Sequence, residues 1–530
     1  MLLLLLHAAL QVPAAASSDS APPIHDALSY EITLVPGDSS LHLLGEVQTT
    51  WRLRSAEPVA PRLDTAMRVV RVLVDGRPNN RLSRTVYGRA GEDVVVPHEK
   101  REGDSITTRI RYHGLVHEGV RIGPNQYGDR TVFGRSRPDL GWYWFPVQKL
   151  PADRATVAFA VQAPLGRQVI GPGALEKIDT LPYGHATWHY RLDTPVPLSS
   201  LAFGVARFAI ATLPREPCGR DCPQVSLWTF PQDSAYALSG PFRRAGAMAA
   251  YFGRTVGPLP FDRLAHVETT LSGPATDNAT AIFYDQARFR ARTLSEDEVA
   301  RGTASQWFGI AVSEGDARQR WLSDGLAGYL AVLWREHVDG PRALGELMRR
   351  AADSAVASSA ISRPVIDTAL GGADSATDPR SLWILHQLRG VMGDSAFVTG
   401  LRRYFRAFRG RTALAADVAR AMSQAAGRDL DWYFRQALTQ PGYPILDVIP
   451  STHGGRLVLT VRQVQPPEWG RYRLPGLGLL LDGRLVRVDV DGPETQVQVP
   501  GISRKPRRIE VDPAGWWLAR MRGQGADVGR

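Results

Sequence analysis

The sequence predicts a multidomain α+β protein in which a mostly helical middle part separates two all-β parts. Near the N-terminus, LSYEITLV (28–35) alternates apolar and polar residues, as a strand with one buried face does. SLWILHQLRGVMG (381–393) and DSAFVTGLRRYFRAF (394–408) instead space their apolar residues at the helical period. After the turn sequence QPGYP (440–444), RLVLTVRQVQ (456–465) alternates again. The 530 residues are enough for several such domains.

The first all-β part is expected over residues 17–213. TVAFAVQAP (156–164) and TWHYRL (187–192) continue the alternating pattern within it. Strands that alternate in this way bury one face and leave the other in water. We therefore expect a single N-terminal β-domain.

The rest of the chain divides into a helical part, a second β part and a tail. Residues 214–440 are expected to be mostly helical, with a few strands near their start. Residues 441–520 contain short alternating strands separated by turn residues, which predicts a small β-sandwich. Residues 521–530 end in the polar sequence GQGADVGR and are expected to be a disordered tail.

Residues 1–16 are expected to be a signal peptide that is cleaved after Ala16. An apolar run over residues 2–12 is followed by three alanines at 14–16, although no Lys or Arg precedes the run. The run is too short to span a bilayer, and no later stretch approaches the roughly 18 apolar residues that a spanning helix needs. We expect an exported chain, periplasmic or secreted, with no transmembrane segment after cleavage.

The charge of the chain is basic but dispersed. The formal net charge is +10, and only four of the 63 Lys and Arg residues are lysines. The arginines are scattered among carboxylates, a pattern typical of a solvated surface and unlike the basic patch of a nucleic-acid-binding protein. No nucleic-acid partner is expected.

The two cysteines lie close together in PCGRDCP. Cys218 and Cys222 are flanked by Pro and Gly, and no second Cys or His pair lies nearby in the sequence. In an oxidising compartment this spacing favours a local disulfide over half of a metal site.

A helix is predicted to begin in TLSEDEVARGTASQWFG (293–309). Ser295 followed by Glu298 is a capping box, and apolar residues follow at helical spacing. Arg301 and Ser305 are four residues apart and therefore lie on one face, with Gly302 beside them. A second helix, WLSDGLAGYLAVLWRE, carries Asp324 in its first turn, where the carboxylate can point across to the first helix.

These two helices resemble the zinc-binding helices of the membrane alanyl aminopeptidase family, which are gluzincin metallopeptidases. That family carries H-E-x-x-H, then eighteen residues, then a liganding Glu, within phrases resembling H-E-x-x-H-Q-W-F-G and W-L-N-E-G-F-A. Eighteen residues separate Ser305 from Asp324 here, and QWFG and WLSDG occupy the matching positions. The resemblance places Arg301 and Ser305 where the two histidines stand, Gly302 at the general base and Asp324 at the liganding Glu.

Two further stretches resemble the same family. PATDNATAIFY resembles the edge strand G-A-M-E-N-W-G-L-I-T-Y that grips the free amine of the substrate, which implies substrate-binding roles for Asp277 and Asn278. TDPRSLWILHQLR places Asp378 where the family has its transition-state tyrosine. The resemblance covers most of the mature chain. It implies an N-terminal β-saddle, a thermolysin-like middle domain and a C-terminal β-sandwich.

The substitutions remove the chemistry of a zinc peptidase. Arg301 is always protonated and has no lone pair for a metal, Gly302 has no side chain, and a Ser305 hydroxyl is a poor zinc ligand. Asp324 is the only surviving candidate metal ligand at these positions. Zinc is the cofactor of the family, but none is expected here, and no catalytic residue is intact at the degenerate positions, Asp378 included.

No other histidine is expected to restore the metal site. His266 and His337 are the nearest in sequence, but one precedes the amine-binding strand and the other lies at the far end of the second helix. The pairs at 113/117 and 185/189 are four apart in strand-like or Gly-broken sequence, where that spacing does not bring both onto one helix turn. We interpret all of these as surface or core histidines.

Three functions remain open from the sequence. The chain is expected to be a pseudoenzyme that binds peptides or protein N-termini through the cleft, or a scaffold whose cleft is vestigial. The alternative is an active aminopeptidase or a hydrolase with a rebuilt site, because carboxylates such as Asp277, Asp324 and Asp378 can do acid–base work. The sequence does not indicate the oligomeric state.

Overall fold

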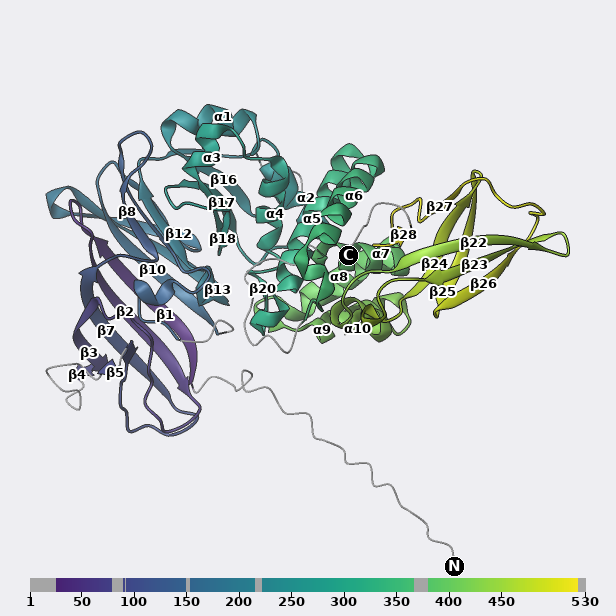
Figure 1. The fold of residues 1–530 in the computed structure, drawn as a ribbon. Helices are drawn as coiled ribbons and strands as arrows, with labels where there is room; N and C mark the ends of the chain where they lie inside the picture. The colour runs from purple at the N-terminus through teal and green to yellow at the C-terminus, as the bar shows by residue number, and fades with distance from the viewer. Residues whose placement is uncertain are drawn as a thin grey trace, which may run out of the picture.

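The computed structural model of the chain describes residues 25–78, 89–90, 92–148, 153–214, 222–366 and 380–522. A sheet-rich N-terminal part and a pair of C-terminal sheets lie at opposite ends of a helical middle part (Figure 1). This arrangement confirms the predicted multidomain α+β fold class. The predicted signal peptide and most of the predicted tail, residues 523–530, lie outside the described residues.

The N-terminal part is built on an eight-stranded sheet in the order β12-β13-β10-β1-β2-β7-β3-β4. Its pairs are antiparallel except for β1 with β10, which is parallel. In β1, Tyr30, Ile32 and Leu34 are buried as the alternation predicts. Leu28 is only half-buried, because a bulge between Ala27 and Ser29 shifts the pairing and turns Ala27 inward in its place.

A four-stranded sheet in the order β11-β14-β9-β8 packs with the large sheet, and β5 pairs with β6. The strands of the N-terminal part are β1 (His25–Pro36), β2 (His42–Leu53), β3 (Met67–Val74), β4 (Arg77–Pro78), β5 (Arg89–Ala90), β6 (Asp93–Val94), β7 (Ser105–Leu115), β8 (Val120–Pro124), β9 (Arg130–Arg135), β10 (Arg154–Pro164), β11 (Gln168–Ile170), β12 (Ala174–Leu181), β13 (His185–Pro197) and β14 (Ala202–Ala206).

The middle part combines a small sheet with a set of helices. The sheet has the order β15-β16-β17-β19-β18, and β20 pairs with β21. Its strands are β15 (Ala209–Thr212), β16 (Gln224–Thr229), β17 (Arg263–Thr269), β18 (Thr276–Asn278), β19 (Ala281–Asp285), β20 (Val312–Glu314) and β21 (Arg411–Ala413).

The helices of the middle part follow the predicted helical segments. They are α1 (Ser234–Ser239), α2 (Ala245–Thr255), α3 (Gln286–Ala291), α4 (Glu296–Ser305), α5 (Arg320–Asp339), α6 (Pro341–Ala357), α7 (Ser381–Met392), α8 (Asp394–Phe408), α9 (Ala415–Ala426) and α10 (Asp431–Thr439). No helix within the described ranges is long and apolar enough to cross a membrane.

The turn between β8 and β9 joins the N-terminal part to the middle part through a buried pair of carboxyl groups. Tyr127 Oη and Gln126 Nε2 donate to Asp233 Oδ2 at 2.8 and 3.0 Å. Asp233 lies beside Glu268 of β17, which has no exposed surface and accepts from the backbone N–H of Phe230 at 2.8 Å. Burial and the neighbouring Asp233 raise the pKa of Glu268 to about 10. At neutral pH Glu268 therefore carries a proton.

The C-terminal part is a sandwich of two sheets with its own apolar core. The sheets have the orders β26-β23-β22-β28 and β25-β24-β27, and Leu446, Leu459 and Leu479 are buried between them. The strands are β22 (Ile445–His453), β23 (Arg456–Gln463), β24 (Arg473–Leu481), β25 (Arg484–Asp491), β26 (Glu494–Val499), β27 (Ile509–Val511) and β28 (Arg520–Met521).

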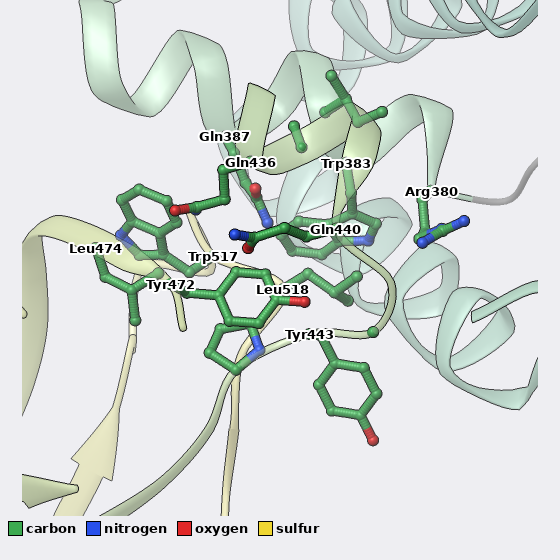
Figure 2. Close-up of a pocket in the computed structure, with 14 residues that line it drawn as sticks. Arg380, Trp383, Gln387, Gln436, Gln440, Tyr443, Tyr472, Leu474, Trp517 and Leu518 are labelled. Carbon is green, nitrogen blue, oxygen red and sulfur yellow. The ribbon is translucent and has the colours of Figure 1, made fainter. Parts of the chain in front are cut away.

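A seam of aromatic and amide side chains joins this sandwich to helices α7 and α10. Gly442 in the connecting turn has a φ of 82°, and a Cβ at that position would lie 2.1 Å from the Trp469 ring, so only glycine fits. Figure 2 shows Trp383, Tyr472 and Trp517 around the side chain of Gln440. The cavity between them has a volume of about 40 Å³, room for a few water molecules.

Candidate functional site

The helix predicted to begin after Ser295 is α4, and its N-terminus is capped as expected. Ser295 Oγ accepts from the backbone N–H of Glu298 at 3.3 Å, and Glu298 Oε2 accepts from the backbone N–H of Ser295 at 3.0 Å. Three acidic residues, Glu296, Asp297 and Glu298, occupy the first turn, where the helix dipole favours negative charge. The reciprocal cap fixes the start of α4 and therefore the direction in which its later residues point.

Arg301 on α4 bridges two carboxylates that come from two other elements. Its Nη2 donates to Asp324 Oδ1 of α5 at 3.0 Å, and its Nη1 donates to Asp277 Oδ2 of β18 at 3.1 Å. The side chains of both aspartates are 13% exposed, and that of Arg301 is 37% exposed. One guanidinium thus ties α4 to α5 and to the edge strand of the small sheet.

Charge and burial act in opposite directions on these groups. Burial raises the pKa of Asp277 above its usual value, and the guanidinium groups of Arg301 and Arg137 oppose that rise. The Asp277 carboxylate, with a contribution from Asp324, raises the pKa of Arg301 further above its already high value. Arg301 therefore stays charged at every pH at which the fold persists, and both aspartates share its charge.

Ser305 lies one turn along α4 from Arg301, and its hydroxyl bonds within its own helix. Its hydroxyl donates to the backbone carbonyl of Gly302 at 2.6 Å, a bond within the same turn of helix. Ser305 is almost fully buried. The hydroxyl also lies close enough to Asp277 to lower the pKa of that carboxyl.

The space beside Gly302 is filled. A Cβ at this position would lie 3.0 Å from Ile282 Cγ2, 3.0 Å from Tyr284 Oη and 3.4 Å from Asp277 Oδ1. A longer side chain at 302 would require these neighbours to shift.

Two further arginines complete the lining of the cleft. Arg320 lies four residues before Asp324 on α5, and its Nε donates to Asp324 Oδ2 at 3.3 Å. Arg137 Nε donates to the backbone carbonyl of Asp277 at 3.0 Å. The cavity that remains between these side chains has a volume of about 10 Å³, which holds about one water molecule.

The proposed amine-binding residues serve the fold in this structure. Asn278 is buried, and its Nδ2 donates to the carbonyl of Thr276 at 3.1 Å. Gln306, which the sequence analysis did not single out, accepts from the backbone N–H of Thr280 and donates to the carbonyl of Asn278, each at 2.9 Å. Its position in QWFG, directly after Ser305, was the feature of the sequence that could have marked Gln306 as part of the site.

The donor set does not fit a zinc ion. Within the ranges that the structure describes, no three His, Cys, Asp or Glu side chains are grouped so that they could hold a metal. The carboxylate of Asp324, the remaining candidate ligand, already accepts hydrogen bonds from Arg301 and Arg320. A guanidinium at the place of the first ligand repels a cation. Asp378 lies outside the described residues, so its assigned place opposite this cleft stays a prediction.

The histidines considered as substitutes lie elsewhere. His266 has no exposed surface and its Nδ1 is 3.0 Å from Tyr284 Oη, and burial lowers the pKa of its imidazole to about 3. His337 stacks on Tyr251 at 4.6 Å between ring centroids. His113 and His189 lie on strands β7 and β13. Cys222 is buried, whereas Cys218 lies outside the described residues, so their disulfide stays a prediction.

Comparisons with known proteins identify the middle part. Residues 272–436 match the peptidase family M1 domain. The chain is 28% identical to aminopeptidase N of Lactococcus lactis subsp. lactis over 184 residues, which are 31% of this chain and 20% of that protein. It is 28% identical to aminopeptidase N of Streptomyces lividans over 269 residues, 43% of this chain and 31% of that protein. These matches span between a fifth and a third of the curated relatives.

Solved structures share the fold over more of the chain. A mutant of the M1 zinc metallopeptidase from Deinococcus radiodurans superposes with a TM-score of 0.69 at 22% identity, covering 79% of this chain and 95% of that one. Legionella pneumophila aminopeptidase A in complex with aspartic acid superposes with a TM-score of 0.80 at 15% identity, covering 96% of this chain and 61% of that one. At these identities the likeness establishes the fold. Together with the domain match over residues 272–436, this likeness makes the chain similar to peptidase family M1, the family that the sequence motifs resemble.

Proposed function

We propose that this chain is a member of peptidase family M1 without zinc-dependent peptidase activity, a pseudoenzyme that acts as a scaffold. The observation that carries the proposal is the Arg301 guanidinium, which donates to Asp277 and Asp324 at 3.1 and 3.0 Å. A permanent cation in this place joins the same elements that a bound metal would join. It also gives the two carboxylates a partner, so that neither is left buried and unpaired.

Arg301, Gly302 and Ser305 supply neither metal ligands nor a general base. A catalytic zinc needs three protein ligands and an activated water, and the general base is the second requirement. Arg301 has no lone pair, Gly302 has no side chain, and the Ser305 hydroxyl is bonded to the Gly302 carbonyl. A rebuilt hydrolase that uses Asp277 or Asp324 as a base would first have to break the pairs with Arg301, which disfavours the alternative.

Binding of a peptide amine in the cleft is also disfavoured. The carboxylate of Asp277 accepts from Arg301, and the cavity beside it has a volume of about 10 Å³. An incoming ammonium group would compete with a guanidinium that is held in place by two carboxylates. A scaffold with a vestigial cleft agrees better with this geometry than a receptor for protein N-termini. Export by the signal peptide, to the periplasm or the medium, is part of the proposal.

The test combines metal analysis with an aminoacyl-arylamide hydrolysis assay on the purified chain after mild chelation. We expect no stoichiometric zinc and no hydrolysis that zinc restores. The double variant Arg301→His with Ser305→His regains two imidazoles beside Asp324 and should bind zinc without hydrolysing substrate, because Gly302 supplies no base. The single variant Ser305→His, which keeps Arg301, is the matched control and should stay metal-free. About one zinc per wild-type chain, with activity lost on chelation, would overturn the proposal.

A further inference from the structure

A groove lies at the C-terminal end of α5, whereas the ion pairs of the cleft lie at its N-terminal end. It is lined by charged side chains and aromatic rings that take no part in the cleft. It lies between the C-terminal end of α2, the last turns of α5 and the first half of α8, and Arg254, Glu336, Arg389 and Arg402 are among the residues that line it. Its volume is about 390 Å³, within the range of small-molecule sites. No residue that lines the Arg301 cleft also lines this groove.

Arg402 is held in a fixed orientation at the rim of the groove. Its Nε donates to the carbonyl of Thr255 at 3.0 Å and its Nη2 donates to the carbonyl of Arg254 at 2.9 Å. These bonds use two of the five N–H donors of a guanidinium and place it at the negative end of α2. The remaining donors are at the surface, where the side chain of Arg254 is also exposed.

The carboxylates of the groove already have a cation. Glu336 Oε2 accepts from Arg389 Nη1 at 2.6 Å, and Asp394 Oδ1 accepts from Arg389 Nε at 2.7 Å. The bond from Arg389 lowers the pKa of Asp394, so this carboxylate stays ionised. Among the ion pairs found within the described ranges, none includes Arg254 or Arg402. Three arginines and two carboxylates leave the groove with a net positive charge.

A row of exposed arginines extends this positive surface along α8. Arg403 and Arg406 are exposed on the helix, and Arg409 follows directly after it. Spacings of three and four residues bring like charges together on a helix, an arrangement that disfavours the helix by a few tenths of a kcal/mol per pair. Such a row raises the local concentration of anions near the groove.

The groove has an apolar floor, and two aromatic rings line it nearer the surface. The ring of Tyr251 stacks on that of His337 with centroids 4.6 Å apart, and Leu333 and Phe397 are buried beside them. A ligand with a flat apolar portion can lie against these side chains while its charged group reaches the rim. The floor therefore distinguishes this groove from a bare cluster of arginines.

We propose that this groove binds a small organic phosphate, with the phosphate on Arg254 and Arg402 and the planar portion against Tyr251 and His337. Guanidinium groups match phosphate oxygens in bidentate hydrogen bonds and stay charged at all relevant pH values. The site is independent of the proposed loss of peptidase activity, because it shares no residue with the cleft.

The test is calorimetric titration of the full chain with phenyl phosphate, inorganic phosphate and phenol. Phenyl phosphate should bind saturably and more tightly than the other two probes, because each of them supplies only one of the two contacts. Arg254→Gln and Arg402→Gln should each weaken binding by about tenfold, the loss expected of a hydrogen bond to a charged group. Arg406→Gln removes the same charge from α8 outside the groove, and it should weaken binding less than twofold.

Three results would overturn the proposal. One is the absence of saturable binding of phenyl phosphate to the wild-type chain. Another is equal weakening by all three arginine variants, since that indicates a diffuse charge effect. The third is sedimentation of the chain with phosphatidylglycerol vesicles in the absence of phenyl phosphate binding, which would assign the arginines to an anionic surface. Because Arg402 also supports the end of α2, Arg254→Gln decides the outcome if the Arg402 variant does not fold.

Discussion

Two pairs of buried carboxyl groups in the middle part are neutralised by different means. Asp277 and Asp324 share the guanidinium of Arg301, at 3.1 and 3.0 Å. Glu268 lies beside Asp233, and burial together with Asp233 raises the pKa of Glu268 to about 10, while Tyr127 and Gln126 donate hydrogen bonds to Asp233. The first pair depends on one cation, whereas the second depends on the protonation of Glu268 and therefore on pH.

The comparison shows two ways in which carboxyl groups that are buried close together can be stabilised. One is pairing with a cation, and the other is protonation. In the cleft the chain uses Arg301, whose guanidinium does not lose its charge, to join α4, α5 and β18. At the contact with the N-terminal part, ionisation of Glu268 beside Asp233 weakens the contact as the pH rises.

The largest expected effect is on the pH dependence of stability through Glu268. Its folded pKa of about 10 lies above the value of 4.5 for an unperturbed Glu, so its contribution is fully present below about pH 4.5 and is lost as the pH rises toward 10. Glu268→Gln keeps a donor toward Asp233 and an acceptor for Phe230 but cannot ionise. The variant should therefore gain about 1.4 kcal/mol relative to wild type for each pH unit in this window.

Urea unfolding at pH 6, 7 and 8 measures this gain. Glu118→Gln, at an exposed glutamate, is the control and should leave the pH dependence of the wild type unchanged. A constant difference in unfolding free energy between Glu268→Gln and wild type across these pH values would show that Glu268 is ionised in the folded chain.

The next effect is the removal of the shared cation. Arg301→Ala leaves Asp277 and Asp324 close together without the guanidinium that donates a hydrogen bond to each of them. Breaking a fully buried pair costs about 3–5 kcal/mol, and the 37% exposure of Arg301 reduces this to about 1–3 kcal/mol. Arg320→Ala removes a single, longer contact to Asp324 at 3.3 Å, and Arg301 still pairs with that carboxylate, so this variant should cost less than about 1 kcal/mol.

A compensating variant sharpens this prediction. Adding Asp277→Asn and Asp324→Asn to Arg301→Ala removes the unpaired charges and should recover part of the lost stability. Chemical denaturation of the single and combined variants at one pH measures the recovery. If the combined variant is less stable than Arg301→Ala alone, the aspartates contribute through contacts other than the pair with Arg301.

Much of the framework could be predicted from the sequence because it depends on local patterns. The capping box at Ser295 and the span of α8 follow from residues close together in the chain. The sequence also indicated that Asp324 can point across to the first helix, where the structure pairs it with Arg301. The bulge that turns Leu28 away from the core has no signal in the alternating pattern itself.

The second partner of Arg301 and the carboxyl pair at Glu268 could not be predicted in the same way. Asp277 was assigned to the amine of a substrate, and its bond to Arg301 depends on where an edge strand 24 residues earlier lies against α4. Asp233 and Glu268 are brought together by sheet packing and by a turn from the N-terminal part. The pair of Arg320 with Asp324, four residues apart on one helix, was the contact that spacing alone could have found.

The smallest expected effect is the difference in stability between alanine substitutions at two helical glycines, Gly302 in the cleft and Gly345 outside it. Gly345 lies in the interior of α6 with no atom within 4 Å of an added Cβ, so Gly345→Ala should stabilise the chain by about 0.5–1 kcal/mol through helix propensity. Gly302 is also within a helix, but an added Cβ lies 3.0 Å from Ile282 and from Tyr284. That crowding costs about 1–3 kcal/mol and cancels or exceeds the gain in propensity. Thermal unfolding of the two single variants compares them directly. If Gly302→Ala stabilises the chain as much as Gly345→Ala, the pocket beside α4 has room for a side chain, and Gly302→Glu becomes a feasible step toward restoring a general base.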